Sequence, residues 1–174
     1  MKNFLVVVDM QKDFVDGALG SKEALAIIPD VVSEIKSFDG QIFATLDTHF
    51  DNYLETSEGR NLPVSHCIKG TDGWLFDENV REALESRGYT AVEKNTFGSV
   101  ALPEMLKNAA EGEEFTIEVI GLCTDICVVS NALILKASFP ETEITVKSSC
   151  CAGVTPDKHL AALETMRSCQ IKVI

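Results

Sequence analysis

Apolar residues along the chain form two alternating kinds of segment. Short runs rich in β-branched and aromatic residues predict buried β-strands, and the longer stretches between them carry apolar residues at helical spacing. Strands are predicted at residues 4–8, 41–46, 89–93, 115–120, 143–147 and 170–174. Helices are predicted at residues 21–38, 78–87, 99–108, 125–136 and 156–167, the last with Thr155 as its N-cap. Each predicted helix connects two strands.

This alternation predicts an α/β fold. Strand–helix–strand units cross over with one hand, so successive strands become parallel and helices cover both faces of the sheet. A chain of 174 residues with 45% hydrophobic composition has the size of one globular domain with its own core. We therefore expect residues 1–174 to form a single three-layer α/β/α domain that binds ligands beyond the carboxyl ends of its strands.

Composition and charge narrow the expected partners. The 15 basic and 27 acidic residues give a formal charge of −12, which repels nucleic-acid phosphates and anionic lipid surfaces. The apolar run at 4–8 ends at Asp9 and is too short for a signal peptide or a membrane span. Six cysteines without zinc-finger or disulfide-scaffold spacing suit a reducing compartment. We expect a cytoplasmic protein with neither nucleic-acid nor membrane partners.

One connection is much longer than the fold requires. Residues 47–74 form a polar segment, whereas α/β connections usually take about 2–6 residues, and long loops of this kind often carry function. Asp47 and His49 stand two positions apart at its start, and His66 returns from the loop. Carboxylates and imidazoles bind divalent first-row metals, so we expect one cation here, zinc in preference to Fe²⁺ or Mn²⁺.

Three further reactive residues follow three different strands. Asp9 comes directly after the first strand, Lys94 after the third, and Cys127 at the start of the helix after the fourth, so all three are expected at one edge of the sheet. A helix N-terminus and a nearby ammonium stabilise a thiolate, which favours Cys127 as a nucleophile supported by Lys94. Asp9 would carry the proton. Individually, each residue could instead be a cap or a packing residue.

Four stretches of sequence carry a family resemblance. They are VVVDMQKDF at 6–14, DTH at 47–49, EKNTFGS at 93–99 and GLCTDICV at 121–128. With these stretches the chain resembles the isochorismatase-like cysteine hydrolases over nearly its whole length, and within them the nicotinamidases. The resemblance implies a six-stranded parallel sheet in the order 3-2-1-4-5-6. It also implies a thioester-forming amidase whose Asp–Lys–Cys triad falls on the same three residues that the strand ends select.

The resemblance further implies how a substrate would be held. It places a cis peptide bond between Leu122 and Cys123, which would turn the backbone N–H groups of Cys123 and Cys127 towards the oxyanion of the reaction intermediate. Leu122 would line the substrate pocket. The motifs place Phe14 and Phe97 near the same pocket, where the two aromatic rings could enclose a flat ring.

The resemblance also extends the expected metal site by one ligand. In the family a histidine or a glutamate completes the D-x-H…H set, and here only Glu55 or Glu58 can take that place, with spacing in favour of Glu58. The metal would orient the substrate and position or acidify the water that attacks the thioester. Pro63 stands three residues before His66, where many nicotinamidases carry an aromatic residue, so the pocket lining is expected to differ.

The expected activity is hydrolysis of nicotinamide to nicotinate and ammonia, a step of NAD salvage. Alternatives are a related amidase acting on ureido or carbamoyl compounds, against which the metal-ligand pattern argues, and a non-catalytic metabolite- or metal-binding domain of the same fold. A thiol protease would need a histidine base, but His159 lies in a predicted helix at an expected solvated position. Homo-oligomers are common in the family and are expected here. The remaining cysteines, expected to be packing residues, are Cys67, Cys150, Cys151 and Cys169.

Overall fold

A six-stranded sheet forms the centre of the protein, whose computed structural model describes all residues, 1–174. The strands are β1 (Lys2–Val8), β2 (Gln41–Asp47), β3 (Thr90–Lys94), β4 (Phe115–Leu122), β5 (Ile144–Ala152) and β6 (Lys172–Val173). All neighbours pair in parallel in the order β3-β2-β1-β4-β5-β6, which confirms the predicted topology. The central strand β1 is wholly apolar and buried from Phe4 to Val8, because helices cover both of its faces.

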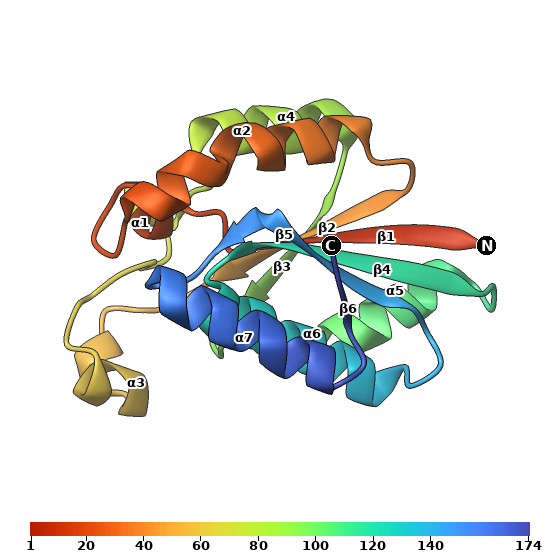
Figure 1. Cartoon of the computed structure of the whole chain (residues 1–174). Coiled ribbons are helices and arrows are strands. Elements are labelled where there is room, and N and C mark those ends of the chain that lie inside the picture. The colour runs from red at the N-terminus through yellow and green to blue at the C-terminus, as the bar shows by residue number, and fades with distance from the viewer.

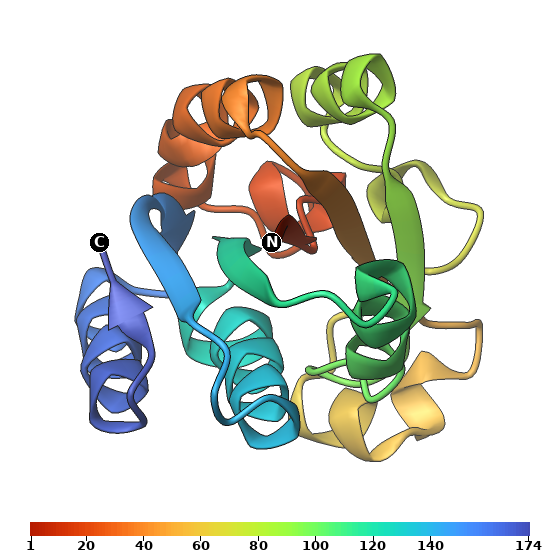
Figure 2. The same cartoon turned by 90° about the vertical axis from the view of Figure 1, so that its right-hand side faces the viewer.

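Helices form the outer two of three layers (Figures 1 and 2). One face carries α2 (Lys22–Ser37) and α4 (Glu78–Arg87), and the other carries α5 (Leu102–Ala110), α6 (Val129–Ser138) and α7 (Pro156–Ser168). Side chains of β1 alternate between the faces, with Leu5 and Val7 in one apolar core and Phe4, Val6 and Val8 in the other. Thr155 caps α7 as predicted, since its side chain accepts the Lys158 N–H.

Several predicted boundaries are wrong. The strand expected at 143–147 continues as β5 to Ala152. The helix expected at 99–108 begins only at Leu102, because Ser99 lies before the first turn and its hydroxyl accepts the Leu102 N–H at 3.2 Å. The strand expected at 170–174 pairs only over the two residues of β6, at the edge of the sheet. None of these differences affects the edge of the sheet where β1 to β4 end.

The start of the predicted helix at 125–136 also differs. Residues Thr124–Val128 form a π-helical turn in which the Val128 N–H bonds to the Cys123 carbonyl at 3.1 Å, and regular α-helix begins with α6. Such wide turns often occur at functional sites.

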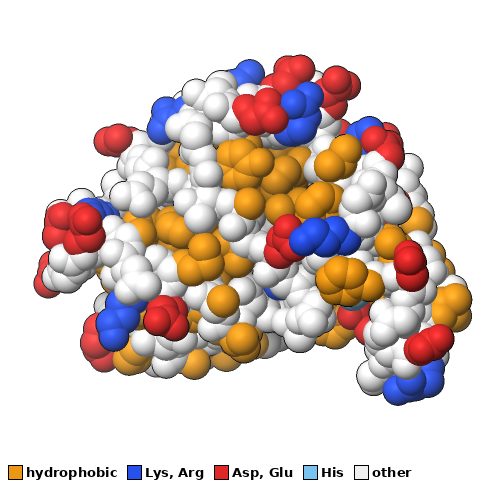
Figure 3. All heavy atoms as spheres, turned by 180° about the vertical axis from the view of Figure 1, so that it is seen from behind, with side chains coloured by type: hydrophobic (Ala, Val, Ile, Leu, Met, Phe, Trp, Pro, Cys, Tyr) orange, Lys and Arg blue, Asp and Glu red, His pale blue; other side chains and the backbone are white.

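The surface and the long loop complete the fold. Acidic and basic side chains are interspersed on the face seen in Figure 3, where apolar side chains gather near the middle. None of the helices combines the length and apolar character that crossing a bilayer requires. Of the four cysteines expected to be packing residues, three are buried and only Cys169 is exposed.

The long loop contains three short helices: η1 (Tyr53–Glu55), α3 (Ser57–Asn61) and η2 (Asp72–Trp74). A fourth short helix, α1 (Lys12–Val15), follows β1.

Candidate active site

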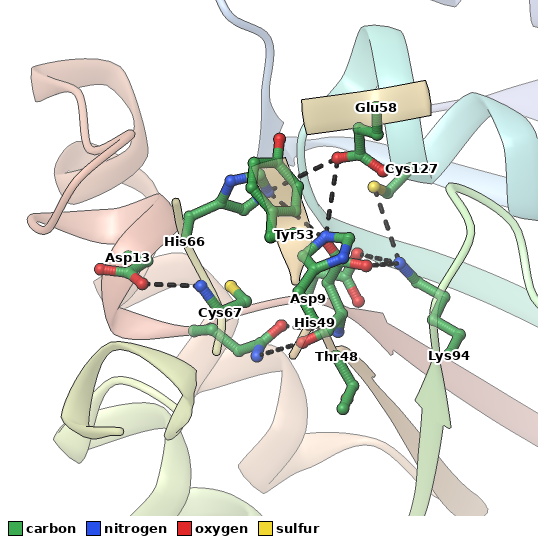
Figure 4. A network of polar contacts seen from close by, with 12 residues as sticks. Asp9, Asp13, Thr48, His49, Tyr53, Glu58, His66, Cys67, Lys94 and Cys127 are labelled. Carbon is green, nitrogen blue, oxygen red and sulfur yellow. Dashed lines mark hydrogen bonds and ion pairs between the residues drawn. The ribbon is translucent and has the colours of Figure 1, made fainter. Parts of the chain in front are cut away.

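A cavity of about 1070 Å³ opens at the carboxyl ends of the strands. Residues of the turn joining α1 to α2, of the loop with α3 and of the start of α7 line it, and these segments lie on the left in Figure 1. Five of the residues expected to act in catalysis or metal binding line this cavity: Asp47, His49, Glu58, His66 and Cys127. Asp9 and Lys94 are buried next to Cys127 and Asp47 (Figure 4). The fold therefore brings together residues that follow four different strands.

Asp9, Lys94 and Cys127 form one buried cluster. The Lys94 Nζ lies 2.6 Å from Asp9 Oδ2 and 3.7 Å from the Cys127 Sγ. The Thr45 hydroxyl donates to the other carboxylate oxygen of Asp9 at 2.6 Å. Asp9 has a backbone φ of 46°, in the left-handed region that side chains other than glycine rarely occupy. Strained residues of this kind tend to occur at functional sites.

The protonation of this cluster differs from the expectation of a resting thiolate. Burial and the negative charge of Asp9 raise the pKa of the Cys127 thiol well above its ordinary value, and the Lys94 ammonium offsets this only in part. Burial also raises the pKa of Asp9, against the opposing effect of Lys94. Burial lowers the pKa of Lys94, but the acidic groups around it, Asp9 foremost, together outweigh burial, so the net shift is upward. Burial therefore disfavours a resting thiolate at Cys127, because desolvation penalises the buried charge.

The backbone around Cys127 is held by a buried asparagine. The Asn131 amide donates to the Cys127 carbonyl at 2.8 Å, and its oxygen accepts the Ser99 N–H at 2.9 Å. This side chain ties the π-helical turn to the loop after β3, and its position in the helix gave no sequence signal. The peptide bond between Leu122 and Cys123 is cis, as expected. The Cys123 N–H makes no hydrogen bond within the protein, and Cys123 lines the cavity.

A second cluster has the composition of a metal site. The ligand atoms of Asp47, His49, Glu58 and His66 all lie within 4.8 Å of one another. His49 Nε2 is 3.0 Å from Asp47 Oδ2 and 3.6 Å from Glu58 Oε1, and His66 Nε2 is 3.7 and 3.6 Å from the same atoms. Ligand atoms bound tetrahedrally at roughly 2.0–2.1 Å from zinc stand about 3.3 Å apart. The two nitrogens and two oxygens therefore fit one divalent cation in type, number and spacing.

The structure also separates the two candidate glutamates. Glu58 lies in the first turn of α3 and reaches the histidines, whereas Glu55 is exposed. His66 Nδ1 is 2.8 Å from the Val64 carbonyl, which can only accept, so Nδ1 carries the proton and Nε2 faces the cluster. Burial raises the pKa of Asp47, but the neighbouring His49 and His66 rings and the Lys94 ammonium together outweigh burial and keep this pKa well below its ordinary value. Asp47 is therefore a charged ligand candidate.

Gln11 supports the metal-ligand cluster from behind, a role that the sequence did not suggest. Its amide nitrogen donates to the carbonyls of Asp47 and Trp74 at 2.9 and 2.8 Å, and its oxygen accepts the Asp47 N–H at 2.7 Å. Gln11 is fully buried, so these bonds are shielded from water. One side chain thus joins the two ends of the long loop.

Asp13 makes a similar connection to the returning part of the loop. Its Oδ2 accepts the Cys67 N–H at 2.8 Å (Figure 4). Cys67 has a φ of 47°, and its carbonyl accepts the His49 N–H at 2.9 Å. Because His66 is the neighbour of Cys67, this carboxylate fixes the backbone beside both histidines. Gln11 and Asp13 belong to the stretch VVVDMQKDF, which was the only sequence signal for either.

The expected substrate-pocket residues line the cavity at different depths. Phe14 and Leu122 are buried, and the Phe14 ring packs against His66 with 5.4 Å between ring centroids. Phe97 lies at the mouth and is 45% exposed. Tyr53 packs against both histidine rings, with centroids 4.7 Å from His49 and 5.0 Å from His66. The cavity wall thus presents aromatic faces next to the cluster of potential ligands.

His159 is not the solvated residue that the sequence suggested. It is partly buried, with Nδ1 at 2.8 Å from the Thr124 hydroxyl and Nε2 at 3.4 Å from that of Ser148. Burial lowers its pKa, so the ring is neutral near pH 7. His159 has no contact with Cys127 and instead holds the first residue of the π-helical turn.

The fold and the site together define the class of protein: an α/β protein in which a buried cysteine cluster lies beside potential metal ligands. The sequence profile of the isochorismatase domain matches residues 3–174, and the chain belongs to the isochorismatase family. The nicotinamidase/pyrazinamidase of Mycobacterium tuberculosis is 29% identical over 186 positions, covering 98% of this chain and 97% of that protein.

Solved structures show the same similarity. The pyrazinamidase of Pyrococcus horikoshii in complex with zinc superposes with a TM-score of 0.82 at 27% identity, covering 100% of this chain and 99% of that one. The nicotinamidase/pyrazinamidase from Bacillus subtilis superposes with a TM-score of 0.84 at 25% identity, covering 99% of each chain. Similarity therefore extends over the entire fold.

Proposed function

We propose that this protein hydrolyses nicotinamide to nicotinate and ammonia through a thioester on Cys127. The observation that carries the proposal is the contact of Lys94 with both Asp9 and Cys127, beside four potential metal ligands in one cavity. Relatives named nicotinamidase/pyrazinamidase support the choice of amide.

The first half of the reaction needs a proton acceptor for a neutral thiol. Asp9, with its raised pKa, takes the proton from Cys127 as the sulfur attacks the carboxamide carbon. Lys94 stays charged and offsets the negative charge on sulfur and carboxylate in turn. The backbone N–H groups of Cys123 and Cys127 donate to the oxyanion. Asp9 then returns the proton to the nitrogen, the C–N bond breaks, and ammonia leaves a thioester.

The second half regenerates the thiol. Asp9 accepts a proton from a water molecule as that water attacks the thioester carbon, and the proton passes to Cys127 when the C–S bond breaks and nicotinate leaves. Phe14 and Phe97 line the path of the pyridine ring. The ligands Asp47, His49, Glu58 and His66 would hold one divalent cation, preferably zinc with Fe²⁺ or Mn²⁺ as alternatives, which supplies Lewis-acid polarisation when bound.

Ammonia release tests the reaction. Purified protein loaded with zinc is incubated with nicotinamide and, separately, with ureido and carbamoyl compounds. We expect release from nicotinamide, and hydroxylamine should divert the acyl group to the hydroxamate because it competes with water for the thioester. Cys127→Ala should lower the rate at least about 10⁴-fold, as loss of a nucleophile does elsewhere. Cys150→Ala, which removes another buried thiol, is the matched control.

A second measurement tests the metal site. Protein purified without chelator should contain about one equivalent of divalent metal, and the double variant Asp47→Ala, His49→Ala should lose it. No ammonia from nicotinamide with metal-loaded wild-type protein would contradict the proposed substrate. Full activity of Cys127→Ala would contradict the thioester, and retention of both metal and activity by the double variant would contradict the metal site.

A further inference from the structure

The cavity is larger than the proposed reaction requires. Its volume of about 1070 Å³ matches cavities of roughly 300–1,000 Å³ that hold drug-sized ligands. A single-ring carboxamide with its reacting carbon at Cys127 occupies only the deep end, next to Phe14 and Leu122. The outer part of the cavity, towards the mouth, remains beyond the ring. A substrate that matches this cavity extends further than a pyridine ring.

Several exposed apolar side chains line the cavity. Four large apolar side chains line it while remaining 38–54% exposed, and they are Phe50, Leu62, Phe97 and Val154. We call these four residues the rim. They come from the loop after β2, the loop after β3 and the connection from β5 to α7, so the rim surrounds the opening on several sides. Exposed apolar residues gathered on one concave surface mark binding sites in soluble proteins.

The charges around the cavity support an apolar rather than an ionic occupant. The carboxylates and histidines lie in its deep part, in the candidate metal cluster. At the mouth, the groups beside the rim are mostly uncharged, such as Asn52 and Asn95, with Lys158 as the single basic residue. The rim and Cys127 line the same cavity, so one molecule can place an apolar group against the rim and its carboxamide at the thiol.

We infer that the preferred substrate is a primary carboxamide whose aromatic ring carries a further apolar group, which lies against the rim. The inference rests on the proposed amide hydrolysis and names the substrate class. Burial of that group between rim side chains removes apolar surface of both partners from water. The gain is realised in kcat/KM, because the same contacts persist in the transition state.

A graded series of amides tests the inference. Ammonia release is measured with zinc-loaded protein for nicotinamide and for nicotinamides with a methyl or phenyl group on a ring carbon remote from the amide. We expect kcat/KM to rise along the series, about tenfold for phenyl, equivalent to about 1.4 kcal/mol. Phe50→Ala and Val154→Ala should each remove much of the phenyl gain. Leu75→Ala is the matched control, since Leu75 is 44% exposed and lies outside the cavity.

Each outcome separates this inference from the proposed function. If nicotinamide is hydrolysed and ring substituents lower kcat/KM, the inference is wrong and the proposed function stands. The same holds if the rim variants slow all amides equally, or if a second copy of the chain covers the rim and excludes the phenyl compound. If wild-type protein hydrolyses no amide of the series, the proposed function itself fails and the inference with it. Both rim side chains are half exposed, so their truncation should leave the fold intact.

Discussion

Replacing Asp13 by alanine should weaken zinc binding although Asp13 is not a proposed ligand. Its carboxylate accepts the Cys67 N–H at 2.8 Å, and the Cys67 carbonyl in turn accepts the His49 N–H. A hydrogen bond to a charged acceptor contributes about 1.5–3 kcal/mol. Its loss lets Cys67 leave its left-handed conformation and moves His49 and His66 apart. We therefore expect the zinc Kd to rise about 10–100-fold, as for other residues that orient metal ligands.

Competition for zinc with a chromogenic chelator measures this Kd directly. Asp13→Asn keeps an oxygen that can accept the Cys67 N–H, so its Kd should rise less than that of Asp13→Ala. Asp16→Ala is the control, since Asp16 is exposed, follows the same short helix and makes no side-chain hydrogen bond. A folded Asp13→Ala protein that binds zinc as tightly as wild type would refute the argument. Equal losses in the Asp13→Ala and Asp16→Ala proteins would point to a general charge effect instead.

Three further substitutions test other parts of the structure. Burial raises the pKa of Glu118 to about 7, so the folded state binds its proton more tightly than the unfolded chain, and stability falls as the pH rises from about 4.5 to 7. After allowance for partial exposure, the free energy of unfolding of Glu118→Gln, measured in urea at pH 8, should therefore exceed that of wild type by about 1 kcal/mol. If the free energy of unfolding of the variant depends on pH as strongly as that of wild type, the prediction is wrong. His159→Phe removes the hydrogen bond to Thr124 and should lower kcat about tenfold at constant KM. His159→Asn should recover most of this rate. Equal losses in the two variants would contradict a role of His159 in positioning the π-helical turn. Thr45→Val removes a hydrogen bond that lowers the pKa of Asp9, so the acid limb of the pH–rate profile should move to higher pH. An acid limb at the same pH as in wild type would exclude Asp9 as the proton acceptor.

The sequence alone predicted the topology and the meeting of distant residues. Parallel strands place their carboxyl ends at one edge, so Asp9, Lys94 and Cys127 could be expected together without any knowledge of side-chain packing. The same reasoning placed Asp47 and His49 at that edge. Hydrophobic patterns predicted the type of each element and the succession of elements along the chain, and the family resemblance predicted the strand order in the sheet. Several element boundaries were not predictable from either.

Other features depend on contacts that no local pattern encodes. The π-helical turn requires a backbone bond from Val128 to Cys123, which differs from an ordinary helix by the position of a single acceptor. Gln11 and Asp13 act through backbone groups more than 30 residues away, so nothing near them in sequence reveals their partners. The thiol's resting state depends on complete burial, which spacing does not report.

The neutral thiol of Cys127 also bears on how the protein withstands oxidants. Hydrogen peroxide and related oxidants attack thiolates far faster than thiols, and they need access to the sulfur. Cys127 is only 4% exposed, and its raised pKa favours the protonated thiol. Burial that disfavours the thiolate should therefore also protect the sulfur of Cys127 from irreversible oxidation while no substrate is bound.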